Sequence, residues 1–191
     1  MNPNTPLPAG LTDKNVEFFQ KDEKLFGLHN GNVKHFDELP PTIIQIIGEE
    51  LHKDTVAQTH LVKWQNSIKE NWSYLQTLQQ YAKCKWGGFD NKPDLLNGKA
   101  MEGEYWDCGS RDTCPHQGKI CKQIKVKHGH ITWREIEVLK LIHAGMQDKE
   151  IADELNLSVQ TIPSFKKNIQ EKTECRSKTD MAVFAEINQI V

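Results

Sequence analysis

Residues 131–162 read ITWREIEVLKLIHAGMQDKEIADELNLSVQTI, a pattern of helices separated by very short turns. Thr132 and Glu135 have the spacing of a capping box, in which the hydroxyl and the carboxylate accept hydrogen bonds from backbone amides of the first turn. Apolar residues at helical spacing then supply a buried face. Gly145 follows where a left-handed residue would end the helix. The first helix is therefore expected between Thr132 and Gly145.

A second short helix is predicted over Asp148–Leu155, followed by a tight turn at residues 156–158. Ser158 is expected to cap a third helix, because a serine hydroxyl accepts well from first-turn amides. Two short helices joined by a turn of three or four residues form the geometry that lets the second helix enter the major groove of DNA. The pattern thus predicts a helix-turn-helix domain.

These residues, with their continuation KKNIQEKTECRSKTDMAVFA, resemble the LuxR/GerE-type DNA-binding domain of bacterial transcription regulators. The resemblance covers the last third of the chain and implies a compact four-helix domain whose third helix reads DNA. It also implies a last helix over 178–187 that often serves dimerisation. The matching positions are Thr132, Arg134, Glu135, Val138, Leu139, Gly145, Lys149, Glu150, Ile151, Ala152, Leu155, Ser158, Thr161, Ile162, Ile169 and Lys172.

The resemblance also implies contacts with double-stranded DNA. It places a phosphate-contacting lysine at Lys149, a threonine near the start of the recognition helix at Thr161, and base-facing positions at Pro163, Ser164 and Lys167. The family commonly has lysine where this chain has Pro163, which removes one donor to a base edge and one helical amide. It commonly has histidine where this chain has Phe165. Base readout is therefore expected to be altered.

The charge pattern around the third helix is mixed. Residues 131–191 contain 8 Lys and Arg and 10 Asp and Glu, a net charge of 8 − 10 = −2. Lys166, Lys167 and Arg176 nevertheless lie on or just after the third helix, and lysines precede the domain. We therefore expect a basic face toward phosphates, with an ordinary solvated surface as the alternative.

The remaining chain is expected to be mainly α. Pro40 and Pro41 mark the start of a short amphipathic helix, and residues 55–82 carry one apolar stripe that predicts a long helix. Asn30-Gly31 suits a two-residue hairpin turn, since both residues accept positive φ. The predicted fold class is an α-rich N-terminal domain with a cysteine-rich loop module, joined to a four-helix helix-turn-helix domain.

Four cysteines follow the predicted long helix with the spacing C-x23-C-x5-C-x6-C: Cys84, Cys108, Cys114 and Cys121. Four thiolates suit tetrahedral Zn²⁺, which is the expected cofactor, or an iron–sulfur cluster. The last three resemble the cluster cysteines of Rrf2-type iron–sulfur regulators in spacing alone. The third alternative is that the four cysteines bind no metal, because the chain lacks the C-x2-C pair that is typical of zinc sites. Substitute ligands are His116, His128 and His130, and Cys175 is expected to be an unreactive thiol.

Length and composition limit the class of protein. The chain has 191 residues, 24 Lys and Arg against 26 Asp and Glu, and no apolar run that approaches a membrane span. The opening MNPNTPLPAG has neither the basic nor the apolar segment of a signal peptide. We expect a cytoplasmic protein. No catalytic motif is found, so an enzyme is not expected.

These observations divide the chain into an α-rich domain at 1–83, a metal-binding module at 84–121, a basic linker at 122–130 and a helix-turn-helix domain at 131–191. The predicted function is a DNA-binding transcriptional regulator that acts as a homodimer. One alternative is an interaction or assembly protein that uses the same domain without reading DNA. A second alternative is an iron–sulfur redox sensor.

Overall fold

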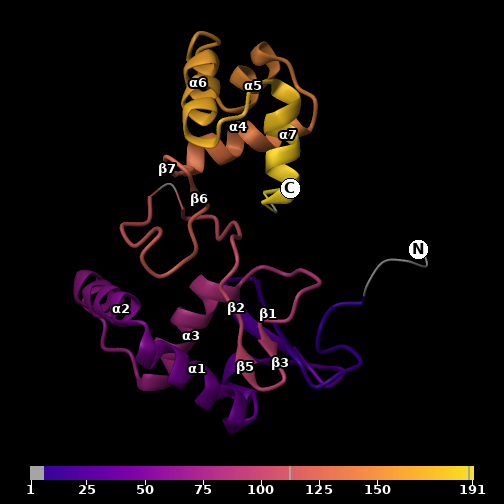
Figure 1. Cartoon of the computed structure of the whole chain (residues 1–191). Coiled ribbons are helices and arrows are strands. Elements are labelled where there is room, and N and C mark those ends of the chain that lie inside the picture. The colour runs from indigo at the N-terminus through magenta and orange to yellow at the C-terminus, as the bar shows by residue number, and fades with distance from the viewer. Residues whose placement is uncertain (1–6, 112, 189) are drawn as a thin grey trace. The chain divides into compact units, whose positions relative to one another are not determined.

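The computed structural model describes residues 7–111, 113–188 and 190–191. Residues 1–6 of the opening segment lie outside the described part of the chain. The chain divides into two compact units (Figure 1). The first contains the chain up to Gly109 together with Cys114–Lys122, and Gln123–Val191 belong to the second. No helix in the described part of the chain has the length and apolar character needed to cross a membrane.

The first unit contains a five-stranded antiparallel sheet, so the prediction of an α-rich N-terminal domain is wrong. The strand order is β3-β2-β1-β4-β5. The unit instead combines helices with a sheet, because short strands joined by tight turns bury Val16, Phe18 and Leu25. The strands are β1 (Val16–Lys21), β2 (Lys24–His29), β3 (Asn32–His35), β4 (Leu95–Leu96) and β5 (Lys99–Ala100).

Three hairpins of this sheet use two-residue turns in which both residues have positive φ. The predicted turn at Asn30-Gly31 is confirmed, with φ of 53° and 76°. Asp22-Glu23 and Asn97-Gly98 form the same kind of turn, with φ of 47° and 65° and of 51° and 74°. Such turns match the twist of the adjoining strands. The register of the sheet is therefore set locally, turn by turn.

Three helices accompany the sheet: α1 (Pro41–Lys53), α2 (Thr55–Ile68) and α3 (Tyr74–Trp86), preceded by a 3-10 turn at Phe36–Glu38. The predicted helix at Pro41 is confirmed, but the single long helix over 55–82 is wrong. Lys69 adopts a left-handed conformation that ends α2, and Ser73 forms a capping box with Gln76 that starts α3. The apolar stripe therefore continues across two helices.

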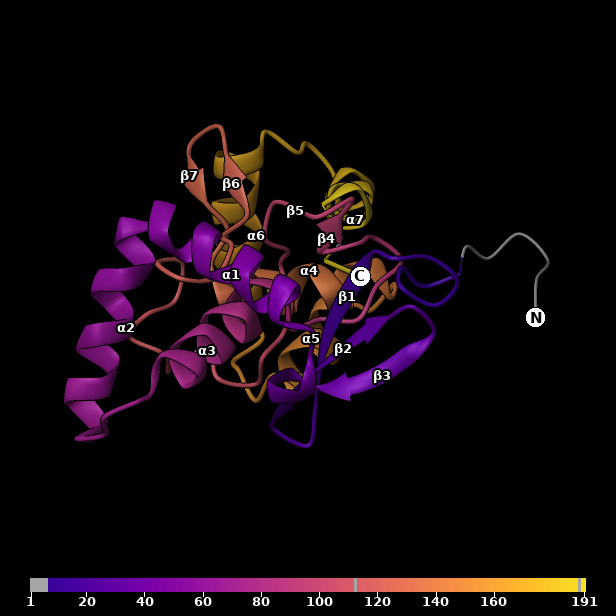
Figure 2. The same cartoon turned by 90° about the horizontal axis from the view of Figure 1, so that it is seen from below.

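The core of the first unit lies between the sheet and these helices (Figure 2). Phe18 of β1 lies with its ring centroid 6.1 Å from that of Trp86 and 6.2 Å from that of Phe36. The amide of Gln20 donates to the carbonyl of Gly87, which joins β1 to the end of α3. The sheet and α3 thus share one buried layer.

The second unit begins with a short hairpin, β6 (Lys125–Val126) and β7 (Gly129–His130), in the segment that was expected to be a linker. Thr132 and Glu135 form the predicted capping box, and Gly145 has a φ of 85° directly after the first helix, as expected. Ser158 does not cap the third helix directly, since Gln160 precedes it. The helices are α4 (Trp133–His143), α5 (Asp148–Glu154), α6 (Thr161–Thr173) and α7 (Lys178–Ile187).

A group of acidic side chains is enclosed in the first unit, which the sequence pattern did not indicate. Glu17 of β1 is fully buried and accepts from the amide of Asp90 at 2.8 Å. Asp94 is 4% exposed and accepts from the amide of Phe18 at 2.7 Å. Burial raises the pKa of Glu17 to about 8, and burial with the neighbouring Glu17 raises the pKa of Asp94 to about 10. Both carboxyl groups are therefore protonated near neutral pH.

This arrangement predicts that the first unit loses stability as the pH rises. Between about pH 4.5 and pH 8, Glu17 is ionised in the unfolded chain but protonated in the folded unit, so folding binds a proton. The free energy of unfolding should fall by about 1 kcal/mol per pH unit for each such group. Replacing Asp94→Asn, which keeps an acceptor for Phe18, should flatten this dependence and raise stability near pH 8.

Urea unfolding followed by tryptophan fluorescence can measure this, since Trp86 lies in the core of the unit. The control is Glu38→Gln, which replaces an exposed acid of the same unit. An unchanged pH slope in Asp94→Asn would contradict the interpretation.

Candidate functional site

The turn between α5 and α6 positions the candidate DNA-reading helix. The amide of Leu157 donates to the carbonyl of Ala152 at 2.8 Å, and Asn156 has a φ of 53°, which ends α5. The amide of Thr161 then donates to the carbonyl of Ser158 at 2.9 Å. This short connection fixes the direction in which α6 leaves α5, as a helix-turn-helix requires.

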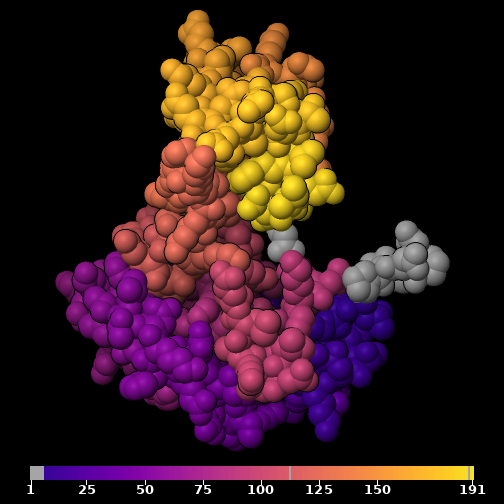
Figure 3. Space-filling view, in the orientation of Figure 1, coloured from indigo at the N-terminus to yellow at the C-terminus, as the bar shows by residue number. Residues whose placement is uncertain are grey.

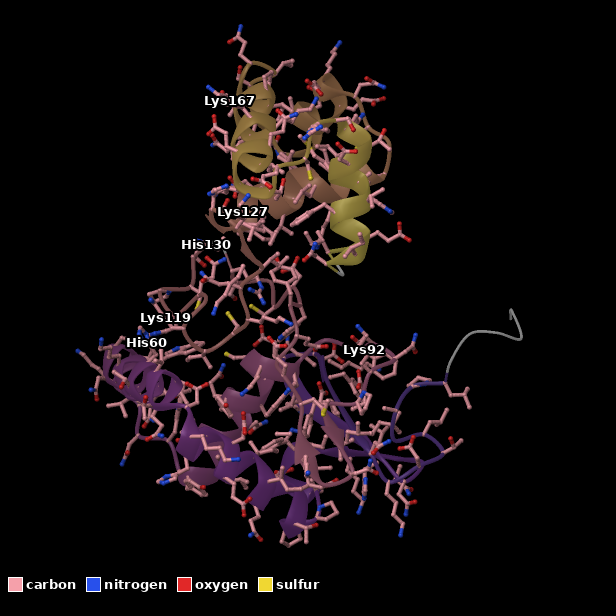
Figure 4. All side chains as sticks on the ribbon, viewed as in Figure 1. His60, Lys92, Lys119, Lys127, His130 and Lys167 are labelled. Atoms are coloured by element: carbon pink, nitrogen blue, oxygen red, sulfur yellow. The ribbon has the colours of Figure 1, made fainter. Side chains whose placement is uncertain are left out.

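One side of α6 is exposed and the opposite side is buried. Ile162 and Ile169 are fully buried and hold the helix in the core of the unit. The opposite side carries the exposed residues Pro163, Ser164 and Lys167. Lys167 lies one helical turn after the adjacent pair Pro163 and Ser164. Figure 4 shows Lys167 on the side of α6 turned away from α7. The predicted base-facing positions therefore share one free surface.

Pro163 is the third residue of α6, because the helix begins at Thr161. The first backbone amides of a helix have no partner within the helix, so the missing amide of proline removes no hydrogen bond there. Proline is thus compatible with the helix start. The second departure from the family pattern is Phe165, where the family commonly has histidine. The Phe165 side chain is half-buried.

The predicted cations differ in their surroundings. Lys149 and Arg176 are exposed. Lys166 is only 23% exposed and its ammonium lies 2.6 Å from a carboxylate oxygen of Asp148. Lys166 therefore links α6 to α5, and a phosphate would compete with Asp148 for it. Lys167 lies 3.8 Å from Glu171 but its side chain is 75% exposed, so its charge faces solvent.

A buried ion pair holds α4 and α6 together, and the sequence pattern did not reveal it. The Lys172 ammonium donates to both carboxylate oxygens of Glu135, at 2.8 and 2.7 Å. The amide and the hydroxyl of Thr132 donate to the same carboxylate at 2.7 and 2.9 Å. The sequence predicted that Glu135 caps α4. It did not predict the contact with Lys172, because Lys172 lies 37 residues further along the chain.

The β6–β7 hairpin lies against the end of α6 (Figure 3). The Lys127 ammonium lies 2.6 Å from a carboxylate oxygen of Glu174, and the amide of His128 donates to the carbonyl of Lys172 at 3.4 Å. Lys127 with His128 lowers the pKa of Glu174. Lys178 donates to the backbone carbonyls of Gly145 and Met146 after α4. These lysines therefore serve packing within the unit.

The four predicted metal ligands all belong to the first unit. Cys84 lies in the last turn of α3, while Cys108, Cys114 and Cys121 lie in the loops after β5. All four are half-buried and, like Cys175 of the second unit, belong to no disulfide among the described residues. As the side chains stand, the described residues include no set of three or more His, Cys, Asp or Glu that could hold a metal ion.

Of the three candidate histidines, His116 lies in the unit that contains the four cysteines, whereas His128 and His130 belong to the β6–β7 hairpin. His116 is buried, stacks on Trp64 with ring centroids 4.9 Å apart, and has its Nδ1 3.2 Å from the Nδ1 of His60. Burial, with His60 nearby, lowers the pKa of His116. Figure 4 marks His60 and His130.

Comparison with known proteins bears on the second unit. The model of the luxR family of bacterial regulatory proteins matches residues 130–185. The transcriptional regulatory protein LiaR of Bacillus subtilis is 32% identical over 80 residues, which is 39% of this chain and 38% of LiaR. The DNA-binding transcriptional activator EvgA of Escherichia coli K12 is 35% identical over 57 residues, 30% of this chain and 28% of EvgA. No solved structure matches the chain.

The third relative, the oxygen regulatory protein NreC of Staphylococcus carnosus, is 40% identical over 52 residues, 27% of this chain and 24% of NreC. The chain thus spans between a quarter and two fifths of the length of these relatives. The α4–α7 arrangement defines a four-helix helix-turn-helix domain. Residues 130–185 are a helix-turn-helix domain of the luxR family of bacterial regulatory proteins, as the sequence resemblance indicated.

The Glu135–Lys172 pair predicts a large effect of one substitution. Lys172→Met keeps most of the apolar stem but leaves the Glu135 carboxylate, 3% exposed, without its countercharge. The second unit should lose about 3 kcal/mol of stability. Hydrogen exchange of the α4 and α6 amides would measure the loss separately from the first unit.

The matched control is Lys167→Met, which removes an exposed lysine from the same helix and should change stability by less than about 0.5 kcal/mol. Equal protection in the two variants would show that the buried pair does not hold α4 to α6.

Proposed function

We propose that this chain is a cytoplasmic DNA-binding transcriptional regulator that reads the major groove with α6. The observation that carries the proposal is the exposed side of α6 formed by Pro163, Ser164 and Lys167, on a luxR-family domain. The cysteine cluster belongs to the other unit, so the metal-stabilised part of the expected function is a separate proposal.

The geometry supports this function in two ways. The buried Ile162 and Ile169 keep α6 fixed while its opposite side stays free, so an entering helix can approach base edges without rearrangement. Exposed Lys149 on α5 and Arg176 after α6 add positive charge at separate points of the same unit. Contacts of this kind with phosphates position a protein on the duplex, while base contacts specify the sequence.

The relatives add support for the domain alone. LiaR is a transcriptional regulatory protein, and EvgA is a DNA-binding transcriptional activator. The family model covers residues 130–185, the part of this chain that contains α5 and α6. By analogy, the second unit would act on DNA and the first unit would supply the input.

An assembly function without DNA readout is the second candidate, and a specific observation favours it. Residues 131–191 carry 8 − 10 = −2 net charge, and Lys166 is already paired with Asp148. A surface of this kind is weaker in electrostatic attraction to DNA than a strongly basic one. Measurement of DNA binding distinguishes the two functions directly.

Homodimerisation through α7 is part of the proposal. Val183 and Ile187 are one turn apart on α7 and have 48% and 74% of their surface exposed. Two large apolar residues on one side of a terminal helix suit a self-complementary contact between two copies.

Substitutions on α5 and α6 test the DNA proposal. We expect the full-length protein to select a duplex sequence from a random pool. Lys167→Ala should weaken binding to that sequence by about 1 to 3 kcal/mol and relax its preference, because a base-edge contact is lost. Lys149→Ala should weaken binding to all sequences alike, because a phosphate contact carries no sequence information. Pro163→Lys should raise affinity or change the preferred sequence.

The control is Lys34→Ala, an exposed lysine of β3 in the first unit, which should leave binding unchanged. Equal affinity of the unmodified protein, Lys167→Ala and Lys149→Ala would rule out readout by α6. Failure of the pool to yield any bound sequence would favour the assembly function.

A charge on α7 tests dimerisation. Ile187→Glu places a carboxylate in the proposed apolar contact and should convert a dimer to a monomer at micromolar concentration, measured by sedimentation equilibrium. Val62→Glu, which places the same charge on an exposed apolar residue of α2 in the first unit, should leave the dimer intact. A monomeric unmodified protein would contradict this part of the proposal.

A further inference from the structure

The loop segment after β5, most of which belongs to the first unit, has few apolar side chains that could hold it in place. Residues 101–122 contain no helix or strand among those that the structure describes, and Ile120 is their one large apolar side chain in the core. A segment of this length normally stays ordered only when burial or a cross-link compensates for the lost conformational entropy. Three of the four clustered cysteines lie in this segment.

The segment returns to the end of α3, where the fourth cysteine lies. The indole nitrogen of Trp106 donates to the carbonyl of Cys84 at 3.4 Å, and the amide of Glu104 donates to the carbonyl of Lys85 at 3.0 Å. The Trp106 ring packs so closely on Gly87 that an added Cβ would lie 2.2 Å from it. Trp106, which comes two residues before Cys108, is therefore attached to the end of α3 close to Cys84.

The thiols themselves have the surroundings of metal ligands. The amide of Gly118 donates to the Cys121 sulfur at 3.3 Å, and the Gln80 side-chain amide donates to the Cys84 sulfur at 3.2 Å. N–H donors to sulfur stabilise a thiolate in preference to a thiol. Gly109, directly after Cys108, has a φ of 73°, which allows a tight turn at a ligand.

Cys84 lies within electrostatic reach of Cys121, Cys108 and Cys114. Figure 4 shows sulfur atoms, in yellow, grouped in this loop region. The described side chains do not stand in a ligating arrangement. An ion would therefore draw the sulfur atoms inward by rotation of the cysteine side chains.

We infer that Cys84, Cys108, Cys114 and Cys121 form a structural zinc site that ties the loop after β5 to the end of α3. Zn²⁺ accepts four thiolates in a closed tetrahedron, and binding releases the thiol protons to solvent. Coordination of such an ion would stabilise a segment that buries too little apolar surface to hold itself in place. The inference is independent of DNA binding, since the cysteines and α6 belong to different units.

The experiment uses the full-length protein, purified without oxygen and analysed for metals. The expected result is about one zinc per chain. Cys108→Ser and Cys121→Ser should each lower the zinc content at least several-fold and should increase protease cleavage within 101–122. Cys175→Ser is the matched control, since Cys175 is also a half-buried free thiol but lies in the second unit, and it should leave both readouts unchanged.

Replacement of zinc by Co²⁺ in the unmodified protein tests the site without any substitution that could prevent folding. Intense thiolate-to-cobalt absorption with the visible bands of a tetrahedral ion is the expected result. Iron with visible absorption in the purified protein would overturn the assignment to zinc. Absence of both stoichiometric metal and cobalt–thiolate absorption would overturn the site itself.

Discussion

The geometry of the second unit depends on one buried carboxylate. Glu135 receives hydrogen bonds from the backbone and hydroxyl of Thr132 and from Lys172, so its charge is satisfied although it is almost fully enclosed. The same group therefore starts α4 and holds the C-terminal part of α6. The exposed side of α6 keeps its direction because the opposite end of the helix is fixed to α4. Any function of Ser164 or Lys167 rests on that attachment.

The first unit is organised by a different constraint, which is that short strands and three helices must share one core. Short strands meet through two-residue turns, and the sheet and α3 share the layer around Phe18 and Trp86. The unit also encloses Glu17 and Asp94, which stay inside as neutral acids hydrogen-bonded to backbone amides. Such groups add specificity to the packing but contribute little to stability. Among the described residues of 101–122, Ile120 is the one large apolar side chain that reaches the core.

Local signals in the sequence were sufficient for the features that depend on a few neighbouring residues. The Thr132 capping box and the Asn30-Gly31 turn follow from spacing and turn chemistry, and both are present. The bounds of α7 follow from the family resemblance and are also confirmed. The sheet was missed because Asp22-Glu23 is an uncommon pair for its turn and the strands are short. The break between α2 and α3 was missed because the apolar spacing outweighed the Ser73 capping box. Local periodicity does not indicate which distant segments will meet. It therefore could not predict the contact of Glu135 with Lys172 or the proximity of Glu17 to Asp94.

The ion pairs within the second unit bear on how salt would affect the proposed binding to DNA. A lysine that meets a phosphate displaces condensed cations from the duplex, and this displacement makes affinity fall as salt rises. Lys166, Lys172 and Lys127 are already neutralised by Asp148, Glu135 and Glu174. Each of them contributes to cation displacement only after it leaves its own carboxylate. The salt dependence of this domain is therefore set by its few unpaired cations and is shallower than the number of its lysines suggests.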